Sequence, residues 1–82
     1  MITFEALHEH LVKRFDLGED LVVMSFDEIE DLVGPVPAGA AHKKAWWHGA
    51  TTRQALAWTL AGWDVDTVGF AARRVAFRRR PA

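Results

Sequence analysis

The side chains best suited to chemistry in this sequence are arginines that gather near its carboxyl end. A guanidinium group pairs with two phosphate oxygens in a fork that lysine cannot offer. On a strand over residues 75–78, Val75 and Phe77 would share one face and leave Arg74 and Arg78 on a basic outer face. The alternative is a solvated edge whose charges discourage pairing between molecules. The arginines of this segment are Arg73, Arg74, Arg78, Arg79 and Arg80.

Tryptophan is the second unusual feature, represented by Trp46, Trp47, Trp58 and Trp63. Exposed indole faces beside cations could stack on unpaired bases. A small domain also needs large apolar side chains in its core, and we expect Trp58 and Trp63 to face inward. Adjacent Trp46 and Trp47 cannot point the same way on a helix or a strand, so one of them should be partly exposed. The basic residues nearest to this group in sequence are Lys43, Lys44 and Arg53.

Metal binding and catalysis find little support in the residue spacing. His8 and His10 flank Glu9, but residues two apart on a helix point about 200° away from each other and cannot bind one ion. The sequence has no cysteine for a thiolate ligand or nucleophile, and helix capping explains Ser25. We therefore predict a protein that is not an enzyme, with no metal, no cofactor and no small-molecule substrate.

The length of 82 residues, half of them hydrophobic, suits a single domain over residues 1–82. Apolar runs such as Leu21 to Met24 are far shorter than the ~20 residues that cross a bilayer. Residues 1–15 mix charged with apolar positions and lack the layout of a signal peptide. We expect a cytoplasmic protein whose residues 79–82 are frayed.

Charge is divided between the two halves of the sequence. Residues 1–41 hold two basic and nine acidic side chains, and residues 42–82 hold eight basic and two acidic ones, so the net charge of -1 hides segments of -7 and +6. A basic surface could meet a polyanion, or acidic and basic faces of two copies could attract each other. The charges could equally interleave in three dimensions and cancel locally.

The first half of the chain predicts a helix, a strand and a second helix. Apolar positions at spacings of three and four predict an amphipathic helix over residues 3–15, with Thr3 as its cap. The β-prone run 21–24 predicts a short strand. Ser25 and Glu28 have the spacing of a capping box, and Gly34 supplies the stop of a helix of about two turns.

The second half predicts two more helices and a hairpin. Residues 37–47 are compatible with a helix that carries His42, Lys43 and Lys44. Thr51 and Gln54 repeat the capping-box spacing before a helix over residues 52–61. Two β-prone segments, 65–70 and 75–77, predict an antiparallel hairpin.

This order predicts an α+β fold that is winged-helix-like: helix, strand, three helices and an antiparallel hairpin. The leading hypothesis is a small nucleic-acid-binding domain, with DNA as the expected nucleic acid and basic side chains on the second helix of the motif and on the hairpin. The alternative is a protein-interaction module, either a homodimer or an accessory subunit, anchored by an exposed tryptophan. The candidate nucleic-acid contacts are Lys43, Lys44, Trp47, Arg53, Arg73, Arg74, Arg78 and Arg79.

Several short motifs are distributed along residues 21–79. They are MSFDEIE at 24–30, Gly34, Pro37, AWW at 45–47, AW at 57–58, AGW at 61–63, Val65, Val68 and VAFR at 75–78. Together they resemble the signature of a family of small uncharacterised bacterial and phage domains of unknown function. In that family an asparagine commonly follows the paired tryptophans, whereas this chain has His48. The resemblance supports the domain limits, and because the family has no established catalytic residues, it assigns no site residue to this chain.

Overall fold

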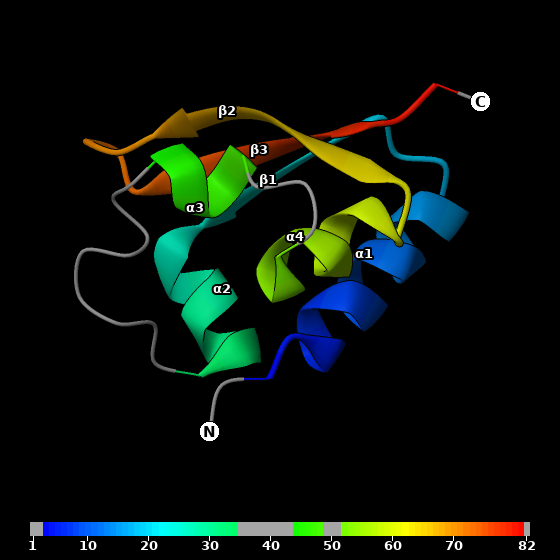
Figure 1. The fold of residues 1–82 in the computed structure, drawn as a ribbon. Coiled ribbons are helices and arrows are strands. Elements are labelled where there is room, and N and C mark those ends of the chain that lie inside the picture. Colours follow the sequence, from blue (N-terminus) through cyan, green and yellow to red (C-terminus); the bar gives the residue numbers. More distant parts are fainter. Residues whose placement is uncertain (1–2, 35–43, 49–51, 82) are drawn as a thin grey trace.

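The computed structural model describes residues 3–34, 44–48 and 52–81. A three-stranded antiparallel sheet lies on one side of the molecule, and the helices pack against one of its faces (Figure 1). The strand order is β1-β3-β2, so the last strand lies between the other two. The predicted α+β class is confirmed. In chain order the elements are α1 (Glu5–Asp16), β1 (Leu21–Ser25), α2 (Phe26–Val33), α3 (Lys44–His48), α4 (Arg53–Thr59), β2 (Trp63–Gly69) and β3 (Arg74–Arg79).

Helix α1 follows the predicted stripe, and its Leu7 and Leu11 are fully buried. The predicted cap was wrong. Phe4 occupies the N-cap position, and within the described residues no side chain bonds the helix start. The backbone N–H of Thr3 instead donates to the carbonyl of Val33 at 3.1 Å, which ties the start of α1 to the end of α2.

Helix α2 confirms the capping box at its start. The Ser25 hydroxyl accepts from the Glu28 N–H at 3.1 Å, and the Glu28 carboxylate accepts from the Ser25 N–H at 3.4 Å. These two contacts satisfy N–H groups that a helix start leaves unpaired. Gly34 ends the helix with φ of 92°, a conformation that costs glycine little and other residues more.

Helix α4 is shorter than the sequence predicts, and α3 is described over part of its predicted range. A helix is present at Lys44–His48, while residues 37–43 of the predicted helix lie outside the described residues. The cap of α4 is Thr52, whose hydroxyl accepts from the Ala55 N–H at 3.3 Å, rather than Thr51. The Gln54 amide donates to the Trp46 carbonyl at 3.3 Å and holds the two helices together.

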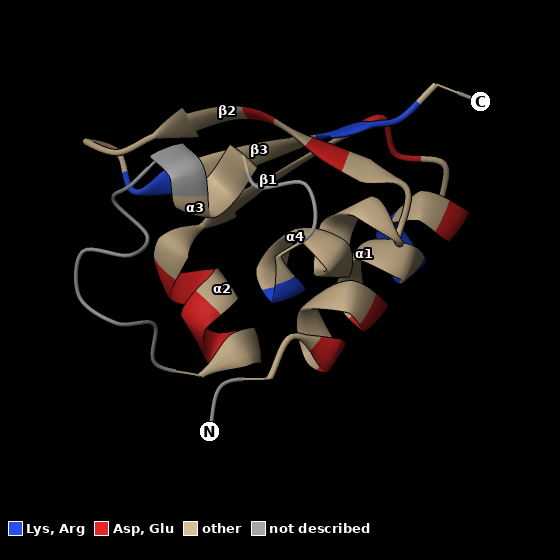
Figure 2. Cartoon of the chain, in the orientation of Figure 1, with Lys and Arg blue, Asp and Glu red and all other residues tan. Residues whose placement is uncertain are grey.

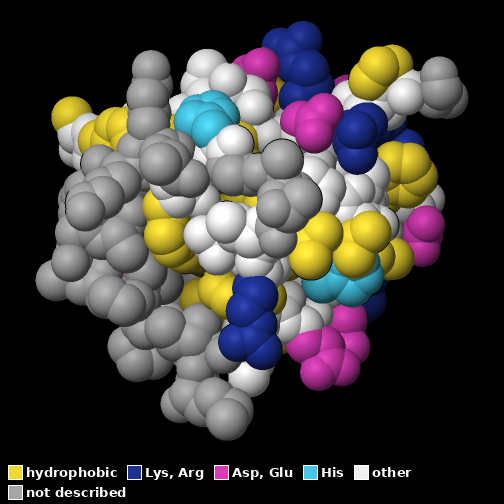
Figure 3. Space-filling model, viewed as in Figure 1, with side chains coloured by type: hydrophobic (Ala, Val, Ile, Leu, Met, Phe, Trp, Pro, Cys, Tyr) yellow, Lys and Arg dark blue, Asp and Glu magenta, His cyan; other side chains and the backbone are white. Residues whose placement is uncertain are grey.

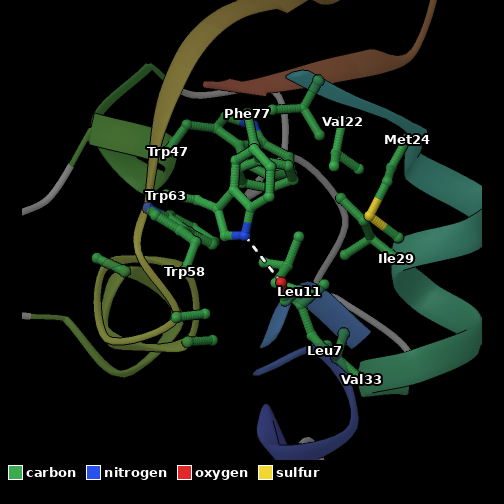
Figure 4. Close-up of a cluster of buried hydrophobic side chains, with 14 of the residues drawn as sticks. Leu7, Leu11, Val22, Met24, Ile29, Val33, Trp47, Trp58, Trp63 and Phe77 are labelled. Carbon is green, nitrogen blue, oxygen red and sulfur yellow. Dashed lines mark hydrogen bonds between the residues drawn. The ribbon is translucent and has the colours of Figure 1, made fainter. Parts of the chain in front are cut away.

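The core lies between the sheet and the helices (Figure 4). Trp58 and Trp63 face inward as predicted, with 2% and 0% of their surface exposed. The indole N–H of Trp63 donates to the Leu11 carbonyl at 2.9 Å, so burial leaves this polar atom paired. Gly62, with φ of 93°, allows α4 and β2 to meet beside Phe15, because a Cβ there would lie 2.5 Å from the Phe15 ring.

The predicted hairpin is confirmed as β2 and β3. The two ladders that β3 forms with its neighbouring strands differ in regularity. Strand β3 pairs with β1 in one continuous register, from Leu21 opposite Arg78 to Ser25 opposite Arg74. The β2–β3 ladder shifts register between Val65 and Thr67. Such an irregularity bends a strand and increases its twist.

Candidate interaction surface

Four of the five carboxyl-terminal arginines are paired with carboxylates of the chain itself. The pairs are Arg73–Asp27 at 3.2 Å, Arg78–Asp66 at 3.1 Å, Arg79–Asp20 at 3.8 Å and Arg80–Asp64 at 3.4 Å. Two of the acidic partners come from the acidic half of the sequence and two from β2, which lies beside β3 (Figure 2). The fold therefore interleaves the charges that the sequence separates.

Arg79 has a structural position that the sequence did not reveal. Its guanidinium lies 3.8 Å from the centre of the Phe15 ring, and it donates to the backbone carbonyls of Phe15 and Glu19. The Arg79 backbone N–H also donates to the Asp20 carbonyl at 2.9 Å. These contacts join β3 to the turn between α1 and β1, and they engage two of the five guanidinium N–H donors of Arg79.

The other predicted cationic contacts are scattered. Arg74 lies at the start of β3 and Arg53 at the start of α4, and neither has an ion pair within the described part of the chain. Lys43 lies outside the described residues, and only the backbone of Lys44, in α3, is placed. On the face seen in Figure 3, the described Lys and Arg side chains stand apart among acidic and apolar ones.

Trp47 belongs to the core rather than to an exposed stacking surface. Its ring is 1% exposed and stacks between Phe26 and Trp58, with centroid distances of 5.3 Å and 5.9 Å. Trp46 is the partly exposed member of the pair, and its ring contacts both Trp47 and Trp58. A base could reach neither face of Trp47 without displacing core side chains.

Strand β1 is an outer strand of the sheet, with β3 as its one neighbouring strand among the described residues. The Phe26 N–H donates to the Arg73 carbonyl and the Arg79 N–H to the Asp20 carbonyl, so the even-numbered residues of this stretch point their backbone groups toward β3. Because backbone direction alternates along an antiparallel strand, the N–H and C=O groups of Leu21 and Val23 point away from the sheet. The side chains of Leu21 and Val23 are 50% and 55% exposed on the face opposite the helices. This edge therefore offers both backbone groups and apolar side chains.

A groove with a volume of about 210 Å³ runs along this edge. It is lined by residues 21–24, by His10 and Arg14 of α1, by Glu19 of the turn before β1 and by Glu28 of α2. Arg14 pairs with Glu19 at 3.1 Å, beside the start of β1, whereas Glu28 bonds Ser25 at its end. One end of the groove therefore holds an ion pair, and the other holds the Glu28 carboxylate. Burial, and next the charge of Arg14, lower the pKa of His10 below its usual value of 6.5.

The surface that sequence reasoning missed is this edge. The run 21–24 predicted a strand, but only the strand order shows that its outer side has no neighbouring strand in the described sheet. One available signal was composition, since residues 21–25 contain neither a charge nor a proline to protect an edge.

Other kinds of site lack support in the described residues. Among them, no group of three or more His, Asp or Glu side chains is placed to hold a metal ion. Within the same ranges, no helix is both long and apolar enough to cross a membrane.

Comparison with known proteins gives one result. A family model matches residues 4–81 and is described as "Domain of unknown function (DUF7662)". This match is wider than the predicted resemblance over residues 21–79. Neither the curated proteins nor the solved structures contain a significant match.

Proposed function

Because the chain belongs to the family Domain of unknown function (DUF7662), which names no activity, we propose a function from its surface: a nonenzymatic protein-interaction domain that binds partners along the edge of β1. Proteins commonly extend a sheet by adding a strand from a partner, which gains backbone hydrogen bonds along the shared edge. The observation that carries this proposal is the outward backbone of Leu21 and Val23 beside their half-exposed side chains.

The ion pairs of the arginines favour protein interaction over nucleic-acid binding, which was the leading hypothesis from the sequence. Nucleic-acid binding requires Lys and Arg side chains that are free to neutralise phosphates and so to release their counterions. Here the acidic partners of Arg73, Arg78 and Arg80 would remain beside any phosphate that displaced them. Of the two candidates for the predicted tryptophan anchor, Trp47 is buried, and Trp46 is partly exposed while its ring contacts Trp47 and Trp58.

Nucleic-acid binding remains a second candidate because of the topology and two cations that have no ion pair among the described residues. The element order is that of a winged helix with one extra helix, and the β2–β3 hairpin would be the wing. Arg74 stands at its tip, where Arg73 has φ of 54°, and Arg53 begins the helix before β2. In such a domain these residues would contact the phosphate backbone.

Photo-crosslinking in cells that express the chain tests the interaction proposal. The photoreactive residue p-benzoylphenylalanine would replace Val23 on β1 or, as a matched control, exposed Thr67 on β2. We expect crosslinks to protein from position 23 and few from position 67. Equal yields at both positions, or none at either, would contradict binding along the β1 edge.

Fluorescence anisotropy tests the second candidate with labelled duplex DNA, single-stranded DNA and RNA across a salt series. The interaction proposal predicts weak binding for the unaltered chain and little change on replacing Arg53 and Arg74 with alanine. Tight binding with a steep salt slope that both substitutions flatten would instead establish nucleic-acid binding.

A further inference from the structure

We infer that a pocket at the carboxyl end of β3 binds a small organic acid, a single carboxylate attached to an apolar group. The pocket has a volume of about 680 Å³, which falls within the range of about 300–1,000 Å³ that is usual for small-molecule sites. It lies where β3 passes the end of α1 and the start of β1 (Figure 1). This inference is independent of partner binding along β1.

Arg79 supplies the group that binds the carboxylate. Its Nε–H donates to the Glu19 carbonyl at 2.8 Å, and an Nη2–H donates to the Phe15 carbonyl. These two bonds use one edge of the guanidinium plane. The edge formed by Nη1 and Nη2 keeps two parallel N–H groups that no hydrogen bond among the described residues uses. Such an edge binds the two oxygens of a carboxylate in a fork.

The guanidinium group of Arg79 is held in place before a ligand binds. It lies 3.8 Å from the centre of the Phe15 ring, and the two backbone carbonyls fix its orientation. The Arg79 side chain is 24% exposed, so water screens its charge less than that of an arginine on the open surface. A donor pair that is already fixed loses little freedom on binding, which favours affinity for an anion.

The carboxylate that pairs with Arg79, that of Asp20, leaves the open edge free. It lies 3.8 Å from Nε, beyond hydrogen-bond distance, and the Nε hydrogen is already donated to Glu19. The Asp20 side chain is 93% exposed, so water weakens its attraction to Arg79. Asp20 also lines the pocket, where it repels a second negative charge. The pocket therefore suits a carboxylate monoanion better than a phosphate dianion.

The remaining walls of the pocket are mostly apolar. Phe15, Leu21 and Pro81 line it, and Leu21 is half exposed without a ligand. Two further arginines line the pocket, but their guanidinium groups pair with aspartates of β2, and their aliphatic stems add apolar surface. These pairs are Arg78–Asp66 and Arg80–Asp64. An apolar group attached to the carboxylate would therefore be covered by these walls, which removes it from water.

NMR titration of the ¹⁵N-labelled chain with octanoate tests the inference. We expect a Kd of about 0.05–5 mM, as suits a ligand of this size, with shifts of the Arg79 Nε–H signal and of the amides of residues 20 and 21. Octanamide lacks the charge and acetate lacks the hydrocarbon chain, so we expect each to bind at least about tenfold more weakly. Octanoate binding no tighter than that of either control would overturn the inference.

Two matched variants of β1 locate the site. Leu21→Glu adds a carboxylate to a residue that lines the pocket, and we expect at least about tenfold weaker binding of octanoate. Val23→Glu adds the same charge to an exposed residue of the same strand that does not line the pocket, and should leave the Kd within about twofold. Equal weakening by both variants, or weakening by Val23→Glu alone, would overturn the inference.

A third variant tests the charge of the pocket without altering the fold at Arg79. Asp20→Asn removes the negative charge that repels the ligand and keeps the backbone carbonyl that accepts from the Arg79 N–H. At low salt we expect octanoate to bind about two- to fivefold more tightly. Unchanged or weaker binding would overturn the role of Arg79 as the anion-binding group.

A competing ligand distinguishes a free acid from the carboxyl terminus of another protein, which carries the same group. The probe is acetyl-dialanyl-leucine with a free carboxylate, measured against octanoate through the same Arg79 signal. We expect the peptide to bind more weakly, because the apolar walls offer its amide groups few hydrogen-bond partners. Tighter binding of the peptide would assign the pocket to protein carboxyl termini and overturn the free acid as its ligand.

Discussion

The two outer strands of the sheet are built in opposite ways. Strand β2 has a register shift between Val65 and Thr67, and it carries Asp64 and Asp66, which pair with arginines at 3.4 Å and 3.1 Å. Strand β1 keeps a continuous register over Leu21–Ser25 and has no charged residue along it. Bulges and charges are the devices by which proteins protect exposed edges from pairing.

The difference indicates that the two edges of the sheet are not equivalent: β1 lacks the bulge and the charges that β2 carries. Helices α3 and α4 also pack near β2 and help to fix its position. The helical wall beside β1 instead leaves a groove along the strand. This contrast between the two edges supports the proposal that β1 receives a partner strand.

The largest expected effect on the free energy of unfolding comes from replacing Trp63, the buried first residue of β2. Trp63→Ala removes a fully buried ring and its 2.9 Å bond to the Leu11 carbonyl. We expect a loss of about 3–5 kcal/mol in the free energy of unfolding, enough to unfold much of a domain this small. Val23→Ala on the open edge should cost less than about 0.5 kcal/mol. Urea denaturation of both variants measures the contrast.

A large cost for Val23→Ala in dilute solution would contradict the contrast. It would mean that Val23 supports the single chain as strongly as a core residue does.

The next largest effect is expected at Arg79, and it should exceed the effect of the same substitution at neighbouring Arg78 on β3. Arg79 holds the turn that precedes β1, through the Phe15 and Glu19 carbonyls and the Phe15 ring. A lysine cannot reproduce that planar fork, so we expect Arg79→Lys to cost about 1.5–3 kcal/mol. The side chain of Arg78 is 68% exposed, so its pair with Asp66 contributes little, and Arg78→Lys should cost less than about 0.5 kcal/mol.

Thermal unfolding of the two lysine variants checks this order. Equal costs would show that the contacts of Arg79 with the turn contribute no more than an exposed ion pair. The two substitutions keep the net charge, so a difference between them cannot come from the overall charge of the chain.

A smaller effect is expected at the other end of β1. Ser25 is both the last residue of that strand and the cap of α2. Ser25→Ala removes the acceptor of the Glu28 N–H and should cost about 1 kcal/mol, while Ser25→Thr keeps a hydroxyl and should cost less. Amide exchange of residues 26–29 reports whether the first turn of α2 opens. A Ser25→Ala chain as stable as Ser25→Thr would show that the cap is dispensable.

Sequence reasoning succeeded where the determining contacts are local. The capping box joins Ser25 to Glu28, and the buried stripe of α1 repeats within one helix. The cap of α4 was misplaced by one residue because Thr51 and Thr52 are adjacent candidates of the same type. Such patterns are visible in a window of a few residues.

The candidate surface required contacts between distant parts of the chain. Arg79 meets the carbonyl of Phe15, 64 positions earlier, and Arg73 meets Asp27, 46 positions earlier. Composition showed a basic half, but not which carboxylates the fold would bring to it. The exposure of β1 likewise depends on β3 entering the sheet between β1 and β2, an order that the spacing of apolar residues does not specify.

The smallest expected effect is a pH dependence confined to the β1 side. His10 lines the β1 groove, where burial first and Arg14 second lower its pKa below 6.5, with Lys13 acting in the same direction and Glu28 and Glu19 opposing them. Between the lowered value and 6.5 the unfolded chain binds more protons than the folded one, so stability must rise with pH there. The stabilisation is complete above 6.5 and is lost as the pH falls through the folded-state pKa. We expect His10→Gln, measured by urea denaturation from pH 5 to pH 8, to remove this part of the profile. An unchanged slope in that variant would assign the dependence to other groups.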